Sequence, residues 1–284
     1  MKWLLLDVNY LAHRAFHTTG FGSTAWGIKT GVIYGVLREI CELTSLFQTE
    51  NLVFCFDSKE SRRRDCIFPG YKLKRQQKIL KASPEEKKAR KALDHQIKML
   101  RTRYLPAIGY KNIFVQCGFE ADDLIASICL ESVNTARDDV IIVSTDKDLY
   151  QLLAHYVKMY NPQTGRIYTF KKFMEEWKIH PLHWYRVKAI AGCSTDEVPG
   201  VPGVAEKTAI KFMNGEIPAE HPTRLKILAH QEMLARNYRL VNLPFPGTKI
   251  MSLRRNVISI KGWKRVLKHL GITRLPNPPT IGKH

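Results

Sequence analysis

Short runs of apolar residues recur along the chain, each bounded by polar residues. Those with the length and content of buried strands are Trp3–Leu6, Leu52–Phe56, Ile113–Val115 and Val140–Val143. Between these runs the apolar residues repeat at helical spacing, as in the stretch 120–131, where they form one face. Strands that alternate with helices are typical of parallel sheets. The pattern therefore predicts an α/β fold with a mostly parallel central sheet and flanking helices.

The segment from about residue 58 to 105 departs from this pattern. Lysines and arginines crowd it, acids are few, and apolar residues are too sparse for a core strand or a fully packed helix. We expect a basic, partly helical excursion from the sheet. Further along, residues 161–165 predict a hairpin turn. From about residue 180 the chain has helical patterns, and the run Pro199–Val204 lies between two of them.

The charge balance is the first indication of function. The chain has 284 residues with 45 Lys and Arg against 26 Asp and Glu, and the resulting net charge of +19 attracts polyanions. Nucleic acid is the common partner of so basic a protein, and an anionic membrane surface is the alternative. No apolar stretch approaches the ~20 residues of a membrane span. The apolar run at the N-terminus is too short for a signal peptide.

The cysteines agree with an intracellular protein. They form no C-x-x-C pair and several lie inside apolar runs, which indicates reduced, mostly buried thiols and argues against a zinc site. We expect a monomer in the cytoplasm, or in the host cytoplasm if a phage encodes it, without membrane association.

Aspartates follow three of the predicted strands. Asp7 ends the first strand and Asp57 the second, and Asp146 and Asp148 come just after the fourth. In open parallel sheets the carboxyl ends of the strands share one edge, and ligands bind at that edge. We therefore expect these carboxylates to gather there.

A second set of acids belongs to the same region. Glu120, Asp122 and Asp123 open the helix after the third strand, and Asp196 lies in a later loop. Taken singly, each acid is better explained as a helix cap or a turn former. Clustered carboxylates repel one another, however, and hard divalent cations take oxygen ligands. In a basic protein, such a cluster predicts a two-metal phosphodiester hydrolase.

Six stretches form an ordered set that spans nearly the whole chain: Leu6–Leu11, Phe56–Asp57, Gly70–Lys72, Glu120–Asp123, Ser144–Asp148 and Val198–Val204. The set resembles the 5′-nuclease superfamily, which includes the 5′-nuclease domain of bacterial DNA polymerase I and stand-alone phage and bacterial flap endonucleases. The resemblance implies a structure-specific 5′-3′ exonuclease and flap endonuclease. Its substrate would be DNA with a free 5′ end, a flap or a nick, and RNA primers are a further candidate.

The resemblance also implies two Mg²⁺ ions. The first site would comprise Asp7, Asp57, Glu120 and Asp122, with Asp123 close by. The second site would comprise Asp146, Asp148 and Asp196. The family has a further aspartate where this chain has Cys193, and usually asparagine where it has Glu197. Because a thiolate suits Mg²⁺ poorly, we expect a weakened second site, at which Mn²⁺ can substitute.

The basic segment resembles the family's helical arch, through or under which a single 5′ strand passes. By resemblance, Lys72 and Arg75 contact the scissile phosphate as catalytic groups, and Tyr71 stacks on a base. The stretch 200–208 resembles the helix-hairpin-helix element. The residues that would bind duplex DNA there, beside a K⁺ ion, are Gly200, Gly203, Lys207 and Thr208. The alternative interpretation is an ordinary turn with solvated charges.

These expectations divide the chain into two parts. An α/β nuclease core occupies residues 1–178, with the arch at about 58–105. A helical C-terminal region occupies 179–284, with the helix-hairpin-helix at about 192–213. The leading hypothesis is an active 5′-nuclease. The alternative is a non-catalytic or weakly active protein that binds branched DNA, in which Cys193 reflects lost chemistry. The retained carboxylates favour activity. An RNA-cutting PIN-type nuclease ranks last, because those chains are usually shorter and lack the arch and the hairpin.

Overall fold

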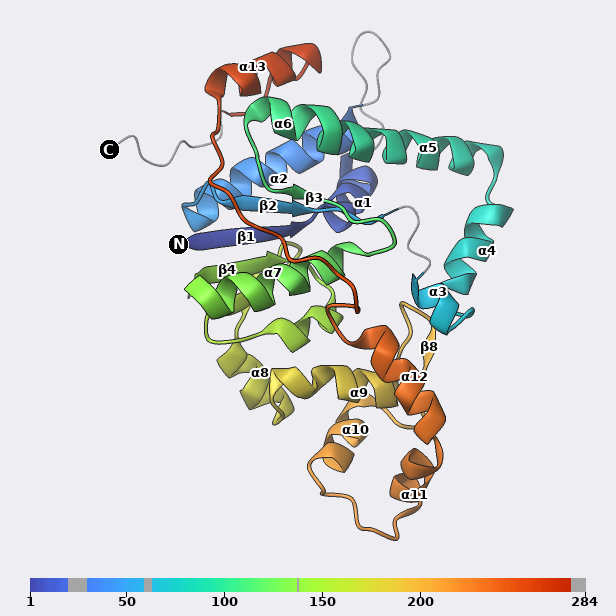
Figure 1. Ribbon diagram of the computed structural model, residues 1–284. Coiled ribbons are helices and arrows are strands. Elements are labelled where there is room, and N and C mark those ends of the chain that lie inside the picture. Colours follow the sequence, from blue (N-terminus) through green and yellow to red (C-terminus); the bar gives the residue numbers. More distant parts are fainter. Residues whose placement is uncertain (20–29, 59–62, 137, 277–284) are drawn as a thin grey trace.

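A six-stranded sheet forms the centre of the protein (Figure 1). The computed structural model describes residues 1–19, 30–58, 63–136 and 138–276. The strands are β1 (Lys2–Asp7), β2 (Leu52–Cys55), β3 (Ile113–Phe114), β4 (Asp139–Val143), β5 (Val157–Asn161) and β6 (Arg166–Tyr168), in the spatial order β3-β2-β1-β4-β5-β6. Neighbours are parallel except β5 and β6, which form the predicted hairpin. The predicted α/β fold is confirmed.

Side chains of the strands alternate between two hydrophobic layers. On β1, Trp3 and Leu5 join one layer and Leu4 and Leu6 the other, because successive residues of a strand point to opposite faces. Helices that cover the first layer include α7 (Ala121–Ala136), α8 (Phe170–Trp177) and α9 (Trp184–Ala191). Those on the second include α1 (Val8–Thr19), α2 (Gly31–Phe47), α6 (Leu105–Ile108) and α13 (Ile260–His269). Because both faces are covered, the strands are continuous apolar runs.

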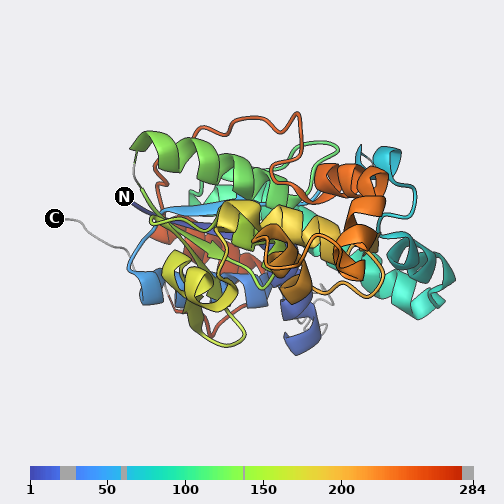
Figure 2. The same ribbon diagram turned by 90° about the horizontal axis from the view of Figure 1, so that it is seen from below.

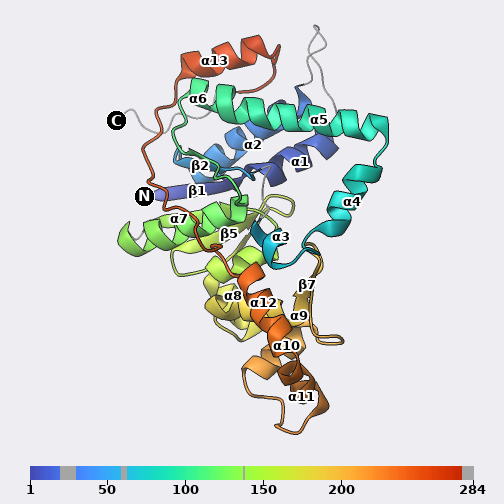
Figure 3. The ribbon, with the colours of Figure 1, turned by 45° about the vertical axis from the view of Figure 1, so that its right-hand side comes forward.

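A series of helices leaves the sheet after β2 and returns before β3. It consists of α3 (Arg63–Ile67), α4 (Leu73–Lys81) and α5 (Pro84–Met99), and a π-helical turn (Leu100–Tyr104) joins α5 to α6. From the outer end of α5, α4 descends to α3 (Figures 1 and 3). None of the residues of α4 is buried. The predicted arch is thus helical over most of its described length, and residues 59–62 lie outside the described residues.

The chain is mostly helical from about residue 180 to 241, as predicted. These C-terminal helices are α9, α10 (Glu206–Met213), α11 (Pro222–Ala229) and α12 (Gln231–Val241); they lie below the level of the sheet in Figure 1, and Figure 2 views the molecule from their side. A short antiparallel pair, β7 (Gly192–Cys193) and β8 (Val198–Pro199), connects α9 to α10. Trp184 and Leu5 share one hydrophobic cluster, so the core is continuous across the predicted division at residue 178. Among the described residues, no helix is long and apolar enough to cross a membrane.

Candidate metal and nucleic-acid site

The carboxyl edge of the sheet gathers acids from separate elements. Asp7 ends β1, Asp57 lies just beyond β2, and Asp146 follows β4. Since β1 lies between β2 and β4, these residues meet where the strand order reverses, as expected for ligand sites in such sheets. Glu120 precedes α7 and Asp122 lies in its first turn. We call Asp7, Asp57, Glu120 and Asp122 the first carboxylate group.

Three further acids adjoin this group. Asp146 and Asp148 lie at the start of a 3-10 helix after β4, and Asp196 comes from the loop between β7 and β8. We call Asp146, Asp148 and Asp196 the second carboxylate group. The two groups are continuous, because the charge of Asp146 acts on Asp7 and that of Glu120 acts on Asp196. The structure thus brings together seven of the acids that the sequence pointed to.

Backbone amides orient several of these carboxylates. Asp7 Oδ1 accepts a hydrogen bond from the amide of Tyr10 at 2.9 Å, and Asp57 Oδ1 accepts one from the amide of Ala121 at 2.8 Å. Asp146 Oδ1 accepts from the amide of Asp148 at 2.8 Å. Each carboxylate is therefore held by the fold itself.

The cluster is electrostatically strained in the absence of cations. Burial and then the charge of Asp57 raise the pKa of Asp7 to about 7. Burial and then the charge of Asp148 raise the pKa of Asp146 to about 6, and burial with Glu120 raises that of Asp57. Repelling carboxylates that offer only oxygen atoms fit hard divalent cations, which would relieve this repulsion.

Lys72 places its ammonium among these acids. Nζ lies 2.8 Å from Glu120 Oε1 and 3.3 Å from Asp196 Oδ1, so one lysine bridges both carboxylate groups. Burial alone would lower the pKa of Lys72, but the charges of Glu120 and Asp196 raise it. The backbone of Lys72 is left-handed (φ 51°) and forms the N-cap of α4. The arch helix α4 therefore begins immediately after Lys72, whose side chain lies in the site.

A cavity of about 460 Å³ separates the arch from the carboxylates. Asp57 and Glu120 contribute to one part of its lining. The cations that line it, all from the arch, are Lys72, Arg75, Arg90, Lys98 and Arg101. Arg75, predicted as a catalytic group, is exposed and lies in this cavity. A polyanion in this space would meet arch cations and two of the acids that fit metal ions within the same lining.

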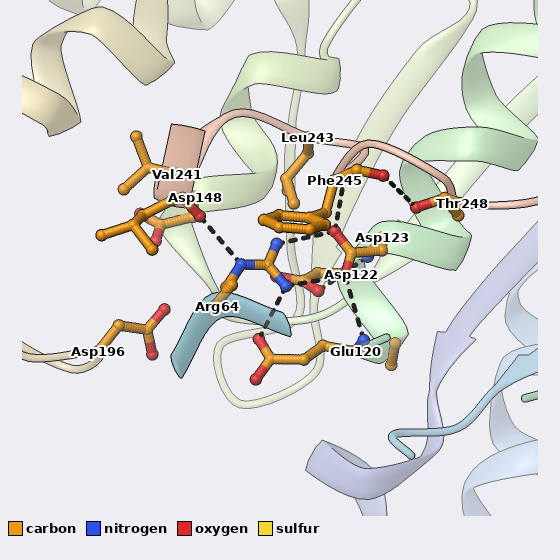
Figure 4. A network of polar contacts seen from close by, with 12 residues as sticks. Arg64, Glu120, Asp122, Asp123, Asp148, Asp196, Val241, Leu243, Phe245 and Thr248 are labelled. Atoms are coloured by element: carbon orange, nitrogen blue, oxygen red, sulfur yellow. Dashed lines mark hydrogen bonds and ion pairs between the residues drawn. The ribbon is translucent and has the colours of Figure 1, made fainter. Parts of the chain in front are cut away.

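Asp123 differs from its prediction as a residue close to the metal. Its side chain is 0% exposed, and each of its oxygens accepts a hydrogen bond at 2.8 Å from the guanidinium of Arg64 (Figure 4). The amides of Glu120 and Phe245 also donate to it. With its oxygens fully engaged, Asp123 fits a ligand role poorly. Instead it holds the start of α7, and Glu120 with it.

Arg64 is a site residue that sequence reasoning missed. Its guanidinium lies 3.6 Å from Glu120 Oε2 and 4.9 Å from the ring centre of Phe245, and it is 4% exposed (Figure 4). In the sequence it is the last of three successive arginines within the basic segment. Nothing in that run distinguishes it, because its burial depends on how α3 packs against α12.

Tyr71 also departs from its prediction. Base stacking requires an open ring face, but Tyr71 is only 2% exposed. Its hydroxyl, which has one proton to donate, lies 2.9 Å from Glu120 Oε2 and 3.1 Å from Asp196 Oδ2. Tyr71 therefore links the two carboxylate groups from below the arch, and the predicted stacking role is a poor fit to this position.

Cys193 lies in the second carboxylate group, where the resemblance placed a missing ligand. Its thiol donates to Asp148 Oδ2 at 3.2 Å, and its sulfur is 3.0 Å from Thr195 Oγ1. Burial and then the charge of Asp148 raise the pKa of Cys193 to about 12, so the thiol is neutral. Lys188, also missed, lies 3.3 Å from Asp148 Oδ1 and reduces the negative charge of this group.

The glycines of the predicted helix-hairpin-helix have different roles. A Cβ at Gly200 would lie 2.2 Å from the carbonyl of Ala191, so this glycine allows the loop to pack against the end of α9. Its predicted close approach is thus to the protein's own backbone. Gly203 has φ 79° with open space around it. Lys207 and Thr208 lie in the first turn of α10, and none of these residues enters the carboxylate groups.

Comparisons with known proteins agree on one family. The model of the 5′-3′ exonuclease N-terminal resolvase-like domain matches residues 2–178. A 5′-3′ exonuclease of Bacillus subtilis (strain 168) is 31% identical over 220 residues, which cover 75% of this chain and 69% of the relative. Thermostable DNA polymerase I of Thermus aquaticus is 30% identical over 251 residues, which cover 84% of this chain but 28% of the polymerase.

Solved structures show the same fold. T5 5′-exonuclease, solved with bound divalent metal ions (zinc), superposes with a TM-score of 0.72 at 23% identity. The match covers 86% of this chain and 90% of that protein.

Proposed function

Since this chain belongs to the 5′-3′ exonuclease family and is a 5′-nuclease, we propose that it cleaves DNA at flaps and nicks near a free 5′ end with two Mg²⁺ ions. The observation that carries the proposal is the cavity between the arch and the sheet edge. Its acids fit metal ions, and its arginines and lysines fit phosphates.

The first carboxylate group would hold one ion and the second carboxylate group the other. Ions bound there would supply Lewis-acid activation of water and neutralise charge on the scissile phosphate. Backbone amides orient Asp7, Asp57 and Asp146 before any ion arrives, which reduces the cost of assembling the site. Asp123 and Arg64 fix the position of Glu120 from behind.

Lys72 and Arg75 would act on the substrate. Both line the cavity, and Lys72 is paired with Glu120 and Asp196. With ions held by those carboxylates, the Lys72 ammonium would be free to bind the phosphoryl group, where it would oppose charge that develops in the transition state. One lysine could thus neutralise negative charge of the carboxylates in the free protein and of the phosphate in the complex.

The loop 200–205 and the start of α10 would bind the duplex part of the substrate. The first amides of a helix attract phosphate, and Lys207 is exposed beside them. A K⁺ ion held by the loop would strengthen this contact. RNA primers have the same phosphodiester backbone and are a second candidate substrate. The protein would act as a monomer in the cytoplasm.

A cleavage assay tests the proposal. A 5′-labelled flap and a nicked duplex are incubated with the protein in Mg²⁺ and, separately, in chelator. We expect products only with Mg²⁺, with cuts near the junction. Tight binding of the flap without any product, in Mg²⁺ or Mn²⁺, would instead support a non-catalytic binder of branched DNA.

A further inference from the structure

The loop that carries Asp196 also holds the beginning of the arch. Glu197 turns away from the carboxylates, and its Oε2 accepts a hydrogen bond from the amide of Lys74 at 2.8 Å. The amide of Arg75 donates to Oε1 at 3.3 Å. One residue earlier, the carbonyl of Asp196 accepts from the amide of Lys72 at 3.0 Å. Two successive residues of the loop therefore bind the first turn of α4.

This contact supplies what α4 lacks. The first amides of a helix have no partner within it, and a side-chain oxygen or a negative charge there is stabilising. Lys72, the N-cap of α4, makes no side-chain capping bond, because an ammonium has no acceptor for the helix amides; it extends to Glu120 and Asp196 instead. No residue of α4 is buried, so packing contributes little to keep this helix in place. Glu197 provides the missing cap from another part of the chain.

The backbone at Glu197 shows how the side chain reaches α4. Its φ of 58° lies in the left-handed region, which glutamate rarely adopts. Asp196 meanwhile keeps its carboxylate near Tyr71 and Lys72. Two neighbouring residues of one loop thus contact different parts of the site: Asp196 contacts the side chains of Tyr71 and Lys72, and Glu197 contacts the backbone of α4.

We propose that Glu197 is a positioning residue, which caps α4 and thereby fixes Lys72 and Arg75 in the cavity beside the carboxylate groups. The geometry couples the order of the arch to the loop of the second carboxylate group. The effect on cleavage rests on the proposed function, whereas the capping itself can be measured without any substrate.

The test compares E197A and E197Q with E86A as a matched control. E197Q keeps an oxygen that can accept from the α4 amides. Glu86 caps the other arch helix, α5, in a reciprocal pair with Ser83, and it has no contact with Lys72 or the acids among the described residues. E86A therefore removes one negative charge and one arch cap without removing the contact at issue. Amide exchange and single-turnover cleavage of a flap are measured for each protein.

In E197A we expect faster amide exchange at Lys74 and Arg75. We also expect single-turnover cleavage at saturating enzyme to slow by about two- to thirtyfold, the range spanned by helix caps. The dissociation constant for the flap and the Mg²⁺ concentration for half-maximal rate should change less than the rate. E197Q should recover most of the rate, and E86A should cleave like the wild type.

Three results would overturn the proposal. Unchanged exchange at Lys74 and Arg75 in E197A would show that Glu197 does not cap α4. A wild-type cleavage rate in E197A, or an equal loss in E86A, would show that the cap does not position the cations. If higher Mg²⁺ restored the cleavage rate of E197A, Glu197 would act as a metal ligand and not as a helix cap. If the wild type cleaves nothing, the proposed function fails, and the exchange data still decide whether the cap exists.

Discussion

The two carboxylate groups lie side by side but are built differently. The first carboxylate group comes from the end of β1, the residue after β2 and the start of α7, and the buried pair of Arg64 and Asp123 holds Glu120 in place. The second carboxylate group comes from a 3-10 turn and from the loop between β7 and β8. Cys193 adds a neutral thiol there, and Lys188 offsets part of the charge of Asp148.

This difference predicts unequal affinity for cations. Affinity for a hard divalent ion rises with the number of charged oxygen ligands and with the rigidity of the site. The first carboxylate group has four acids on or directly beside regular elements, whereas the second has three acids from a 3-10 turn and a loop. Lys72 lies beside one acid of each group, and Lys188 adds a further cation only beside the second. The second carboxylate group should therefore set the Mg²⁺ concentration that cleavage requires.

The largest expected effect is on the first carboxylate group. D57N should slow cleavage by about a thousandfold or more, because losing a ligand weakens an ion whose contribution is several kcal/mol. Binding of a flap should change little. D139N is the control, since Asp139 begins β4 at the opposite edge and pairs with Lys158 at 3.0 Å. If D57N and D139N had similar single-turnover rates, Asp57 would not be a metal ligand.

The next largest expected effect is on stability, and it concerns the buried Arg64–Asp123 pair that holds the first carboxylate group. R64A leaves Asp123 buried without its partner, and such a loss costs about 3–5 kcal/mol of unfolding free energy. R63A is the neighbouring control, because Arg63 is exposed and its guanidinium lies 4.6 Å from the ring centre of Phe119. Urea unfolding measures both. Equal small losses would mean that the Arg64 pair does not stabilise this group.

The sequence predicted what depends on strand order and hydrophobic pattern. Apolar runs that end at Asp7 and Asp57 placed both acids correctly, because the carboxyl ends of parallel strands meet at one edge. The hairpin at residues 161–165 followed from turn chemistry. Such features are local, or they follow from one general rule of sheet topology.

What could not be predicted depends on side-chain direction. Asp122 and Asp123 are adjacent, but a helix turns by about 100° per residue, so their carboxylates face different surroundings. The opposite directions of Asp196 and Glu197 follow from a single left-handed residue. The burial of Arg64 could not be predicted, because the sequence does not indicate which arginine of a run packs into the core. These facts require the tertiary structure.

The raised pKa of Asp7 predicts how stability depends on pH without metal. Folding raises this pKa from its usual value near 3.8 to about 7, so the folded state binds more protons between these values. Stability contributed by this site therefore falls as the pH rises from about 4 to about 7. D7N lacks this charge. In chelator it should be more stable than the wild type at pH 8, by on the order of 2 kcal/mol, and nearly equal to it at pH 4.

Thermal unfolding at both pH values, repeated with Mg²⁺, checks this expectation. Mg²⁺ should stabilise the wild type at pH 8 more than it stabilises D7N, because an ion that binds only the folded state adds to stability. If the stability difference between the wild type and D7N were the same at pH 4 and pH 8, folding would not raise the pKa of Asp7.

The smallest expected effect concerns Cys193 and tests the comparison most directly. C193D adds a carboxylate beside Asp148 and should lower the Mg²⁺ concentration for half-maximal cleavage by roughly tenfold, since each added charged oxygen ligand strengthens the site. C193S is the matched control, because it replaces the thiol without adding charge. Wild-type activity should also appear at lower Mn²⁺ than Mg²⁺, since a given ligand set binds Mn²⁺ more tightly.

The structure separates this expectation from the competing role of Glu197. If Glu197 supplied the missing ligand, E197Q would shift the Mg²⁺ titration and C193D would not. Its carboxylate accepts from the amides of Lys74 and Arg75, so we expect E197Q to leave the titration unchanged. A shift in C193D alone would confirm that the second carboxylate group limits the metal requirement. Coinciding curves for all the variants would mean that the second carboxylate group does not set the Mg²⁺ concentration that cleavage requires.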